Sequence, residues 1–260
     1  MQMNVAPDSS SDTQTIAANA AAIRARMDAA CARAGRSPES VRLLPVSKTI
    51  SVERVRAAIA AGLHMLGENK VQEAKEKAEA LAGADVRWSI IGHLQSNKAR
   101  YVARFAQEFQ ALDSVKVAEA LQRRLEIEGR TLDVYVQVNT SAEPSKFGLE
   151  PDAALDFARE LPAVPALRVR GLMTLAIFSS DDERVRRCFR LLREVQERLR
   201  QDGPAGLAWD ELSMGMSGDF EAAIEEGSTV VRVGQAIFGA RPLPDSHYWP
   251  GAAGAVDDKG

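Results

Sequence analysis

The sequence predicts a single-domain α/β protein whose fold is a (β/α)8 TIM barrel with an extra N-terminal helix. Short apolar runs alternate with longer amphipathic runs, the alternation repeats eight times, and no linker or charge break interrupts it. Repeated βα units need parallel strands with helical crossovers, and eight of them close naturally into a barrel. The alternative is an open, doubly wound sheet, but no GxGxxG motif follows the first strand to favour it.

The predicted elements follow one another in a regular order. The strands are short runs of aliphatic and β-branched residues at 43–47, 64–69, 88–92, 109–113, 132–140, 167–174, 211–215 and 228–234. Helical periodicity predicts helices at 13–34, 51–62, 70–83, 97–105, up to 125, 151–161, 181–202, 219–226 and from about 235. Ser51 suits the N-cap of the second helix, whose apolar residues fall on one face.

The composition is that of an ordinary globular domain. The 260 residues are 45% hydrophobic and 27% charged, enough to bury a core without a metal or a disulfide. We expect the barrel to span 13–242, between flexible tails at 1–12 and 243–260. The net charge of −3 gives no reason to expect nucleic acid as a partner, and no apolar run approaches the roughly 20 residues that span a bilayer. Cys31 and Cys188 are predicted to be reduced structural thiols, which fits a cytoplasmic protein without a signal peptide.

Lys48 is the first candidate for chemistry. The active site of a barrel lies at the carboxyl ends of its strands, so polar residues directly after each apolar run are the candidates. Only eight of the 33 lysines and arginines are lysines, and of these Lys48 alone ends an apolar strand. Desolvation in the barrel mouth would lower its pKa and make it nucleophilic toward carbonyls. The residues leave open that Lys48 caps the rim or pairs with Glu68.

Two loops of small residues, 213–219 and 233–239, follow the predicted strands seven and eight. Backbone N–H groups and helix N-termini converge at such loops, which form the usual phosphate site of a barrel. The alternative is that their glycines only permit tight turns. Arg232 interrupts an apolar run, so it must either face the barrel mouth, where it would hold an aromatic nitrogen of a cofactor as an acceptor, or pair with an acid at the barrel base.

Weaker candidates remain. His93 ends a strand and could line the pocket or simply lie at the rim. A pair of catalytic carboxylates, Glu68 with Asp113, is a disfavoured alternative. The arginines of helix 181–202 interleave with acids, which is typical of a solvated helix face rather than an RNA-binding patch.

Several long motifs resemble the pyridoxal phosphate homeostasis protein family, from about residue 24 to 241. They are PVSKT, GENKVQEAKEK, WSIIGHLQSNKARYV, VNTSAEPSKFGL, VRGLMTL and ELSMGMSGDFEAAIEEGSTVVRVGQAIFGAR. The resemblance implies a barrel similar to the N-terminal domain of alanine racemase. It also implies that pyridoxal 5′-phosphate (PLP) is held covalently as a Schiff base by Lys48.

The resemblance further implies a set of cofactor-binding residues. Asn69 would lie beside the pyridine ring and Arg232 would face its nitrogen, while His93 and Met173 would line the pocket. The phosphate group would be held in the two loops by Ser213, Ser217, Gly234 and Gln235, with Met216 between them. Two positions depart from the family pattern: Lys70 follows GEN where Tyr or Arg is usual, and Gln235 replaces Thr or Ser, so its contribution there could be only a backbone N–H.

The resemblance implies a non-catalytic cytoplasmic protein that holds PLP and buffers or delivers it, with apo-PLP enzymes as conceivable clients. The alternative is a PLP-dependent amino-acid racemase. Racemases of similar fold add a β-rich domain and a tyrosine base, and none of Tyr101, Tyr135 and Tyr248 is an obvious equivalent. Without that domain, a monomer is expected. A third hypothesis is a barrel enzyme that acts on a sugar phosphate, with Lys48 capturing its carbonyl.

Overall fold

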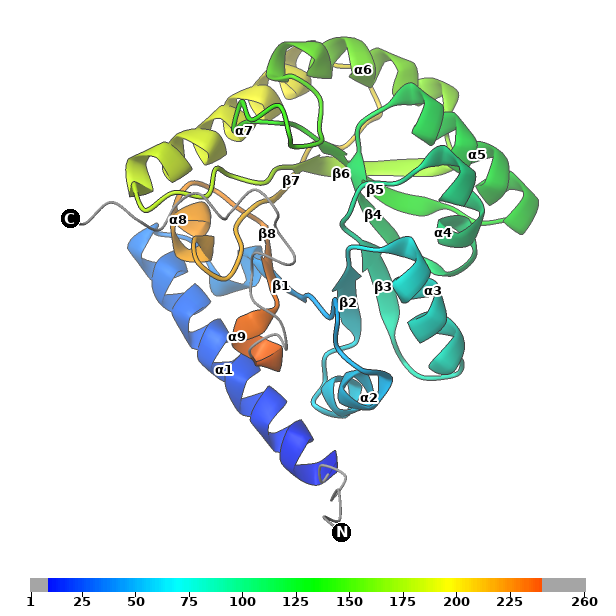
Figure 1. Ribbon diagram of the computed structural model, residues 1–260. Helices are drawn as coiled ribbons and strands as arrows, with labels where there is room; N and C mark the ends of the chain where they lie inside the picture. Colours follow the sequence, from blue (N-terminus) through cyan, green and yellow to red (C-terminus); the bar gives the residue numbers. More distant parts are fainter. Residues whose placement is uncertain (1–8, 240–260) are drawn as a thin grey trace, which may run out of the picture.

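The structure is a computed structural model that describes residues 9–239, and these form a barrel of eight parallel strands (Figure 1). The strands are β1 (Arg42–Pro45), β2 (Met65–Glu68), β3 (Arg87–Ile90), β4 (Glu108–Leu112), β5 (Leu132–Gln137), β6 (Leu167–Met173), β7 (Glu211–Ser213) and β8 (Val230–Val233). They pair in the order β1-β8-β7-β6-β5-β4-β3-β2. A bridge between Val46 and Gly67 joins the two remaining edges just beyond β1. The predicted barrel is confirmed.

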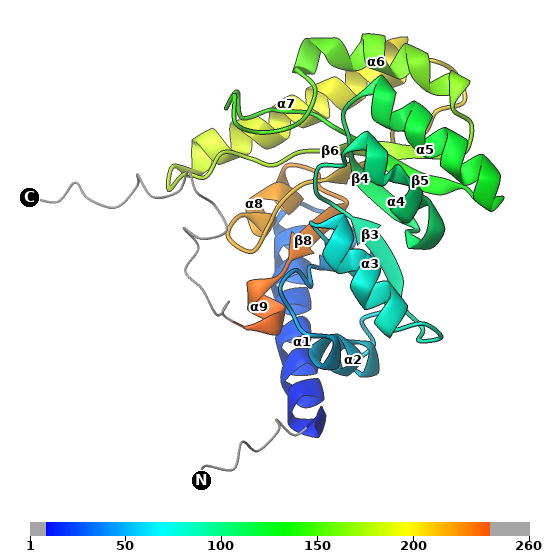
Figure 2. The same ribbon diagram turned by 45° about the vertical axis from the view of Figure 1, so that its right-hand side comes forward.

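Helices surround the barrel and connect its strands (Figure 2). They are α1 (Ser9–Arg33), α2 (Val52–Ala60), α3 (Val71–Ala80), α4 (Ala99–Phe105), α5 (Val115–Glu128), α6 (Ala154–Glu160), α7 (Asp182–Asp202), α8 (Phe220–Glu225) and α9 (Gln235–Phe238). The predicted cap is present, since the Ser51 hydroxyl accepts a hydrogen bond from the Arg54 N–H. Ser114 caps α5 in the same way. Such caps satisfy backbone donors that the first turn leaves unpaired.

The extra helix α1 packs against α2, α8 and α9 on the outside of the barrel (Figure 1). Its buried side chains recur every three or four residues: Ile16, Ala20, Ile23, Met27 and Ala30. The helix begins at Ser9, four residues before the predicted start, so the expected flexible tail is wrong for 9–12. The remainder of that tail and the predicted tail at 243–260 lie outside the described residues.

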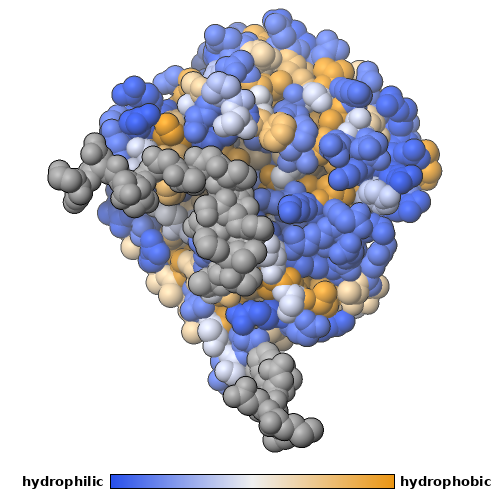
Figure 3. Space-filling view, viewed as in Figure 1, coloured by the Kyte–Doolittle hydropathy of each residue, from blue (hydrophilic) through white to orange (hydrophobic). Residues whose placement is uncertain are grey.

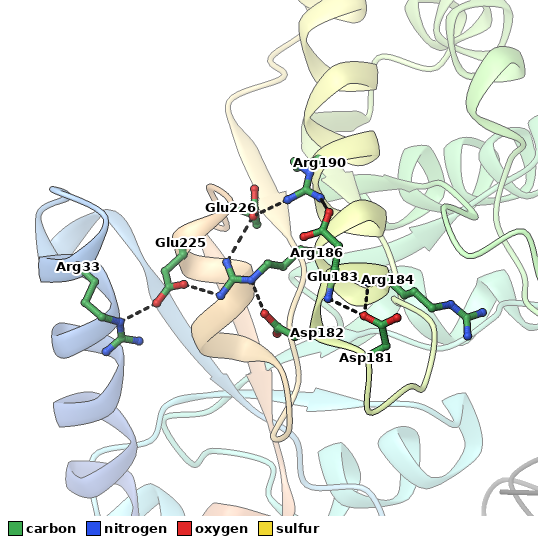
Figure 4. A network of polar contacts seen from close by, with 9 residues as sticks. All are labelled: Arg33, Asp181, Asp182, Glu183, Arg184, Arg186, Arg190, Glu225 and Glu226. Atoms are coloured by element: carbon green, nitrogen blue, oxygen red, sulfur yellow. Dashed lines mark hydrogen bonds and ion pairs between the residues drawn. The ribbon is translucent and has the colours of Figure 1, made fainter.

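Ion pairs between helices hold α1, α7 and α8 together (Figure 4). Arg33 of α1 and Arg186 of α7 both contact the carboxylate of Glu225, at 2.7 and 2.6 Å. Arg190 and Arg186 also contact Glu226. Four arginines of α7, Arg186, Arg190, Arg198 and Arg200, therefore pair with acids, which agrees with a charged helix face of mixed sign rather than a basic patch.

The surface outside the grey atoms in Figure 3 is mainly hydrophilic, with hydrophobic residues scattered over it. Within the described residues, no helix combines the length and apolar character that a membrane span requires. No cluster of His, Cys, Asp and Glu that could hold a metal ion occurs in that part of the chain either. Cys31 and Cys188 are buried and form no disulfide, as predicted.

The close contact of β6 with β7 gives a prediction for stability. Gly171 pairs with Glu211, and a Cβ at position 171 would lie 1.8 Å from the Glu211 carbonyl oxygen. We expect Gly171→Ala to lower the free energy of unfolding by about 1–3 kcal/mol, because the two strands must separate to admit the methyl group. Thermal unfolding of Gly171→Ala beside Gly218→Ala, whose Cβ would meet nothing within 4 Å, measures the effect. Equal melting temperatures for the two variants would contradict the prediction.

Candidate functional site

Lys48 follows β1 at the carboxyl end of the barrel, half-buried, as predicted. Its backbone is held on both sides by residues of α3. On one side, the ammonium of Lys77 donates to the Ser47 carbonyl oxygen at 2.6 Å. On the other side, the Thr49 N–H donates to the carboxylate of Glu73 at 2.5 Å. Lys48 therefore stands on a turn whose two flanking peptide groups are tied to one helix.

Glu68, which ends β2, lies beneath this turn and is fully buried. One of its oxygens, Oε1, accepts from the Ser47 hydroxyl at 2.7 Å and from the Lys77 ammonium at 2.6 Å. Burial outweighs the attraction of Lys77 and raises the pKa of Glu68 to about 6. The cation that the structure pairs with Glu68 is thus Lys77, which differs from the pairing with Lys48 considered above.

Lys77 is a residue that sequence reasoning missed. Its position in a helix suggested a solvated side chain, but only 4% of the residue is exposed. The sequence spacing could have predicted this burial, because Val71, Ala74 and Lys77 lie three residues apart and form the buried face of α3. A lysine on an apolar helix face needs a buried acid, and Glu68 at the end of the preceding strand supplies it.

Arg232 of β8 points into the barrel interior and is 3% exposed. Its guanidinium donates to the Ser213 hydroxyl and to the Thr174 carbonyl oxygen, both at 2.7 Å. Desolvation lowers its pKa to about 10, so the side chain stays charged at neutral pH. Among residues 9–239, no carboxylate lies within ion-pair distance of it. The alternative of an acid partner at the barrel base is wrong.

A chain of buried polar side chains links Arg232 to the opposite end of the barrel. The Ser213 hydroxyl donates to the Gln110 side-chain oxygen, and the Gln110 amide donates to Glu108, both at 2.6 Å. Glu108 in turn accepts from Arg42 at 2.7 Å. These hydrogen bonds fix the Arg232 side chain. They also engage the hydroxyl of Ser213, which was predicted to contact a phosphate group.

The loop after β7 is closely packed and presents backbone donors. Gly215 has φ of +95°, and a Cβ there would lie 2.6 Å from the Ala223 Cβ, so only glycine fits. The Met216 N–H is taken by the Asp219 carboxylate. The N–H groups of Ser217 and Gly218, by contrast, have no acceptor within the described part of the chain. They are available to a ligand.

The loop after β8 approaches β1. A Cβ at Gly234 would lie 3.1 Å from the Val46 carbonyl oxygen, and the Gly234 N–H has no acceptor among the described residues. Gln235 begins α9, which has four residues, and α8 has six. Helices this short have weak dipoles, so the expected contribution of helix N-termini is small and the case for an anion rests on the backbone N–H groups themselves.

The remaining predicted residues follow other strands around the mouth. Asn69 directly follows β2 and is half-buried, whereas Met173 ends β6 and is fully buried. The His93 ring nitrogen Nδ1 lies 3.5 Å from the Asp113 carboxylate, and its ring stacks on Phe147 with centroids 3.8 Å apart. Because Asp113 is engaged by His93 and Glu68 by Lys77, the two acids do not form a catalytic pair.

The hydroxyls of both described tyrosines are engaged by other side chains, that of Tyr101 by Arg100. Tyr135 lies inside the barrel at its amino end, where its hydroxyl donates to Glu211 at 2.6 Å and accepts from Arg42. Tyr101 belongs to α4, and the cationic groups of Lys75 and Arg100 lie over its ring. Tyr248 is outside the described residues. These contacts engage both hydroxyls, so neither described tyrosine is an obvious counter-base to Lys48.

The comparisons with known proteins agree with this architecture. The family model of the alanine racemase N-terminal domain matches residues 12–242, which defines the class of barrel. The chain belongs to the pyridoxal phosphate homeostasis protein family. A member from Pseudomonas aeruginosa is 43% identical over 227 residues, which cover 87% of this chain and 96% of the relative.

Solved structures place the chain in the same group. The structure of PipY from Synechococcus elongatus, solved with PLP bound, is 35% identical and has a TM-score of 0.74, covering 86% of this chain and all of PipY. Alanine racemase from Streptomyces lavendulae is 21% identical with a TM-score of 0.65, over 86% of this chain and 58% of the racemase. The latter likeness shows the fold alone.

The raised pKa of Glu68 predicts a pH dependence of stability. The folded protein holds this proton more tightly than the unfolded chain, whose carboxyl has a pKa of 4.5, so the stabilising contribution is complete below pH 4.5 and is lost as the pH rises through 6. We expect the free energy of unfolding of the wild type, relative to Glu68→Gln, to fall by about 2 kcal/mol across this window. Urea unfolding at a series of pH values measures it.

Glu76→Gln is the control for this measurement, because Glu76 is an exposed glutamate of α3, the helix that carries Lys77, and it contacts only Gln72 among the described side chains. Its stability relative to the wild type should stay nearly constant over the same pH range. A difference between wild type and Glu68→Gln that does not change with pH would contradict the assignment of the titration to Glu68.

Proposed function

We propose that this protein binds PLP in the barrel mouth, with Lys48 as its covalent anchor, and serves PLP homeostasis by holding and buffering this reactive aldehyde. The observation that carries the proposal is the position of Lys48. It follows β1, and β1 pairs with β8, so Leu44 lies opposite Arg232 and Pro45 opposite Val233. One lysine, one buried guanidinium and two loops with available N–H groups therefore share one end of the barrel.

The side chains present fit the chemistry of this cofactor. Attachment requires the neutral amine of Lys48, which adds to the aldehyde carbon and releases water as the C=N bond forms. The N–H groups of Ser217, Gly218 and Gly234 suit a phosphate dianion, and the closely packed glycines let the backbone approach it. Asn69, His93, Met173, Met216 and Gln235 are proposed to complete the pocket, on the strength of their positions after the strands.

Arg232 suits a protein that holds the cofactor, although racemases of similar fold also tolerate an arginine at this place. One terminal nitrogen of the Arg232 guanidinium donates to Ser213 and the other donates to Thr174, and the remaining N–H groups are further donors for a ligand. A charged donor facing the pyridine nitrogen keeps that nitrogen unprotonated, and an unprotonated ring is a weaker electron sink than the protonated one. PipY is described with PLP bound, and the curated relatives are named for homeostasis and not for an enzymatic reaction. Delivery to apo-enzymes, a monomeric state and a cytoplasmic location stay predictions.

The covalent anchor is tested by absorbance. Purified wild type incubated with PLP should acquire a visible band that borohydride bleaches while fixing the cofactor to the protein, and Lys48→Ala should lack this band. Lys116→Ala is the matched control, because Lys116 is exposed on α5, and it should behave as the wild type does. Mass spectrometry of the reduced protein should locate the added mass on the peptide that contains Lys48.

A wild type that stays colourless in the presence of added PLP would overturn the proposal and favour the sugar-phosphate hypothesis. A band that persists in Lys48→Ala would leave PLP binding intact and reject Lys48 as its anchor.

The racemase alternative is tested by hydrogen exchange. PLP-loaded protein incubated with L-alanine in deuterium oxide should show no exchange at the α-carbon above that of free PLP, because neither described tyrosine is an obvious counter-base. NMR of the recovered amino acid measures the exchange. Rapid exchange that Lys48→Ala abolishes would establish the racemase alternative.

A further inference from the structure

The turn that carries Lys48 is attached to α3 by two side chains one helical turn apart. Glu73 holds the Thr49 N–H, and Lys77 holds the Ser47 carbonyl oxygen. The two side chains also contact each other, because the Lys77 ammonium lies 2.7 Å from Glu73 Oε1. We call Glu73 and Lys77 the α3 clamp.

The backbone that the clamp holds is in an unfavourable conformation. Thr49 has φ of +65°, in the left-handed region that β-branched residues avoid. Such a residue persists only where its surroundings hold it in place, and conformations of this kind cluster at functional sites. The Glu73 carboxylate accepts the N–H of this same residue, so it stabilises the strained peptide directly.

Lys77 of the clamp and its partner Glu68 are buried in a way that stability alone does not require. Lys77 is 4% exposed and Glu68 is fully buried, and the second carboxylate oxygen of Glu68 has no hydrogen-bond partner in the described part of the chain. Taking such charges out of water is unfavourable, and apolar side chains of similar size commonly replace a buried ion pair without loss of stability. We therefore attribute the presence of these buried charges to their contacts with the turn, which hold the peptide groups on both sides of Lys48.

We propose that Glu73 and Lys77 are positioning residues that fix the peptide groups flanking Lys48, so that its amine is presented to the aldehyde group of PLP. The inference rests on the proposed function. It assigns to α3 a role that is separate from the two phosphate loops. Among the described residues, the hydrogen bonds of Glu73 and Lys77 reach the peptide groups beside Lys48 and the Glu68 carboxylate, and none of them reaches the loops after β7 and β8.

This separation predicts a difference between two ligands. PLP needs both the loops and a positioned amine, whereas pyridoxine 5′-phosphate has the same ring and phosphate but no aldehyde for Lys48 to attack. Loss of the clamp should therefore weaken PLP binding and leave pyridoxine 5′-phosphate binding unchanged. A clamp with a merely structural role would affect both ligands alike.

Two variants remove the clamp without leaving a buried charge unpaired. Glu73→Ala removes the partly exposed acceptor of the Thr49 N–H, and the double variant Glu68→Gln/Lys77→Met removes both fully buried charges. Glu76→Ala is the matched control, because it makes the same change on the exposed face of α3. Glu73→Gln is a rescue variant, since its amide oxygen can still accept from Thr49.

The experiment compares dissociation constants of the full-length proteins for PLP, by absorbance, and for pyridoxine 5′-phosphate, by calorimetry. We expect each clamp variant to bind PLP about tenfold more weakly and to attach it more slowly, because a misplaced amine loses the advantage of orientation. Binding of pyridoxine 5′-phosphate should stay within about twofold of the wild type. Glu76→Ala should match the wild type with both ligands, and Glu73→Gln should recover most of the PLP affinity.

Equal weakening of both ligands, or no weakening of either by Glu73→Ala, would overturn the inference. If the double variant fails to fold, Glu73→Ala decides by itself. Failure of the wild type to attach PLP is a different result, because it rejects the proposed function and the clamp together. Attachment by the wild type with unchanged attachment in the clamp variants rejects the clamp alone.

Discussion

The pairing of β1 with β8 is the interaction on which the site depends. It brings the first and last strands of the barrel together, with Leu44 opposite Arg232 and Pro45 opposite Val233. The residues that follow these strands, Lys48 and Gly234, therefore meet at one mouth although nearly 190 positions separate them in the sequence. In an open sheet β1 would lie at an edge, and Lys48 and the two loops could not contact the same ligand.

One series of hydrogen-bonded polar side chains runs through the barrel interior, and it determines how Arg232 can interact with a ligand. A buried guanidinium without an acid partner is stable only if hydrogen bonds compensate for its lost hydration. Ser213 and Thr174 provide these bonds, and Gln110 and Glu108 extend them toward the amino end of the strands. Within residues 9–239, Arg232 thereby forms no ion pair and feels a carboxylate, that of Asp219, only at longer range, so its remaining N–H donors suit a pyridine nitrogen.

Much of this could be predicted from the sequence, and the failures have a common cause. Alternating runs placed all eight strands, and the rule that barrel sites lie at strand ends was sufficient to select Lys48 and the two loops. Which polar side chain contacts which depends on helix rotation and strand register. The pairing of Glu68 with Lys77 and the use of the Ser213 hydroxyl inside the barrel are set by this packing. The early start of α1 was missed because its first turn lacks apolar residues.

A protein that buffers a cofactor must also release it, and the proposed site is built for both. The phosphate would be held by backbone N–H groups of two short loops, whose partial charges bind an anion less tightly than a guanidinium or ammonium group does. The covalent bond to Lys48 would supply the remaining affinity, and water reverses that bond. Because the α3 clamp positions the amine independently of the loops, the covalent and the electrostatic parts of the affinity can be set separately. A site of this kind retains PLP through a bond that hydrolysis can undo, while the anion contacts stay weak enough for the cofactor to leave.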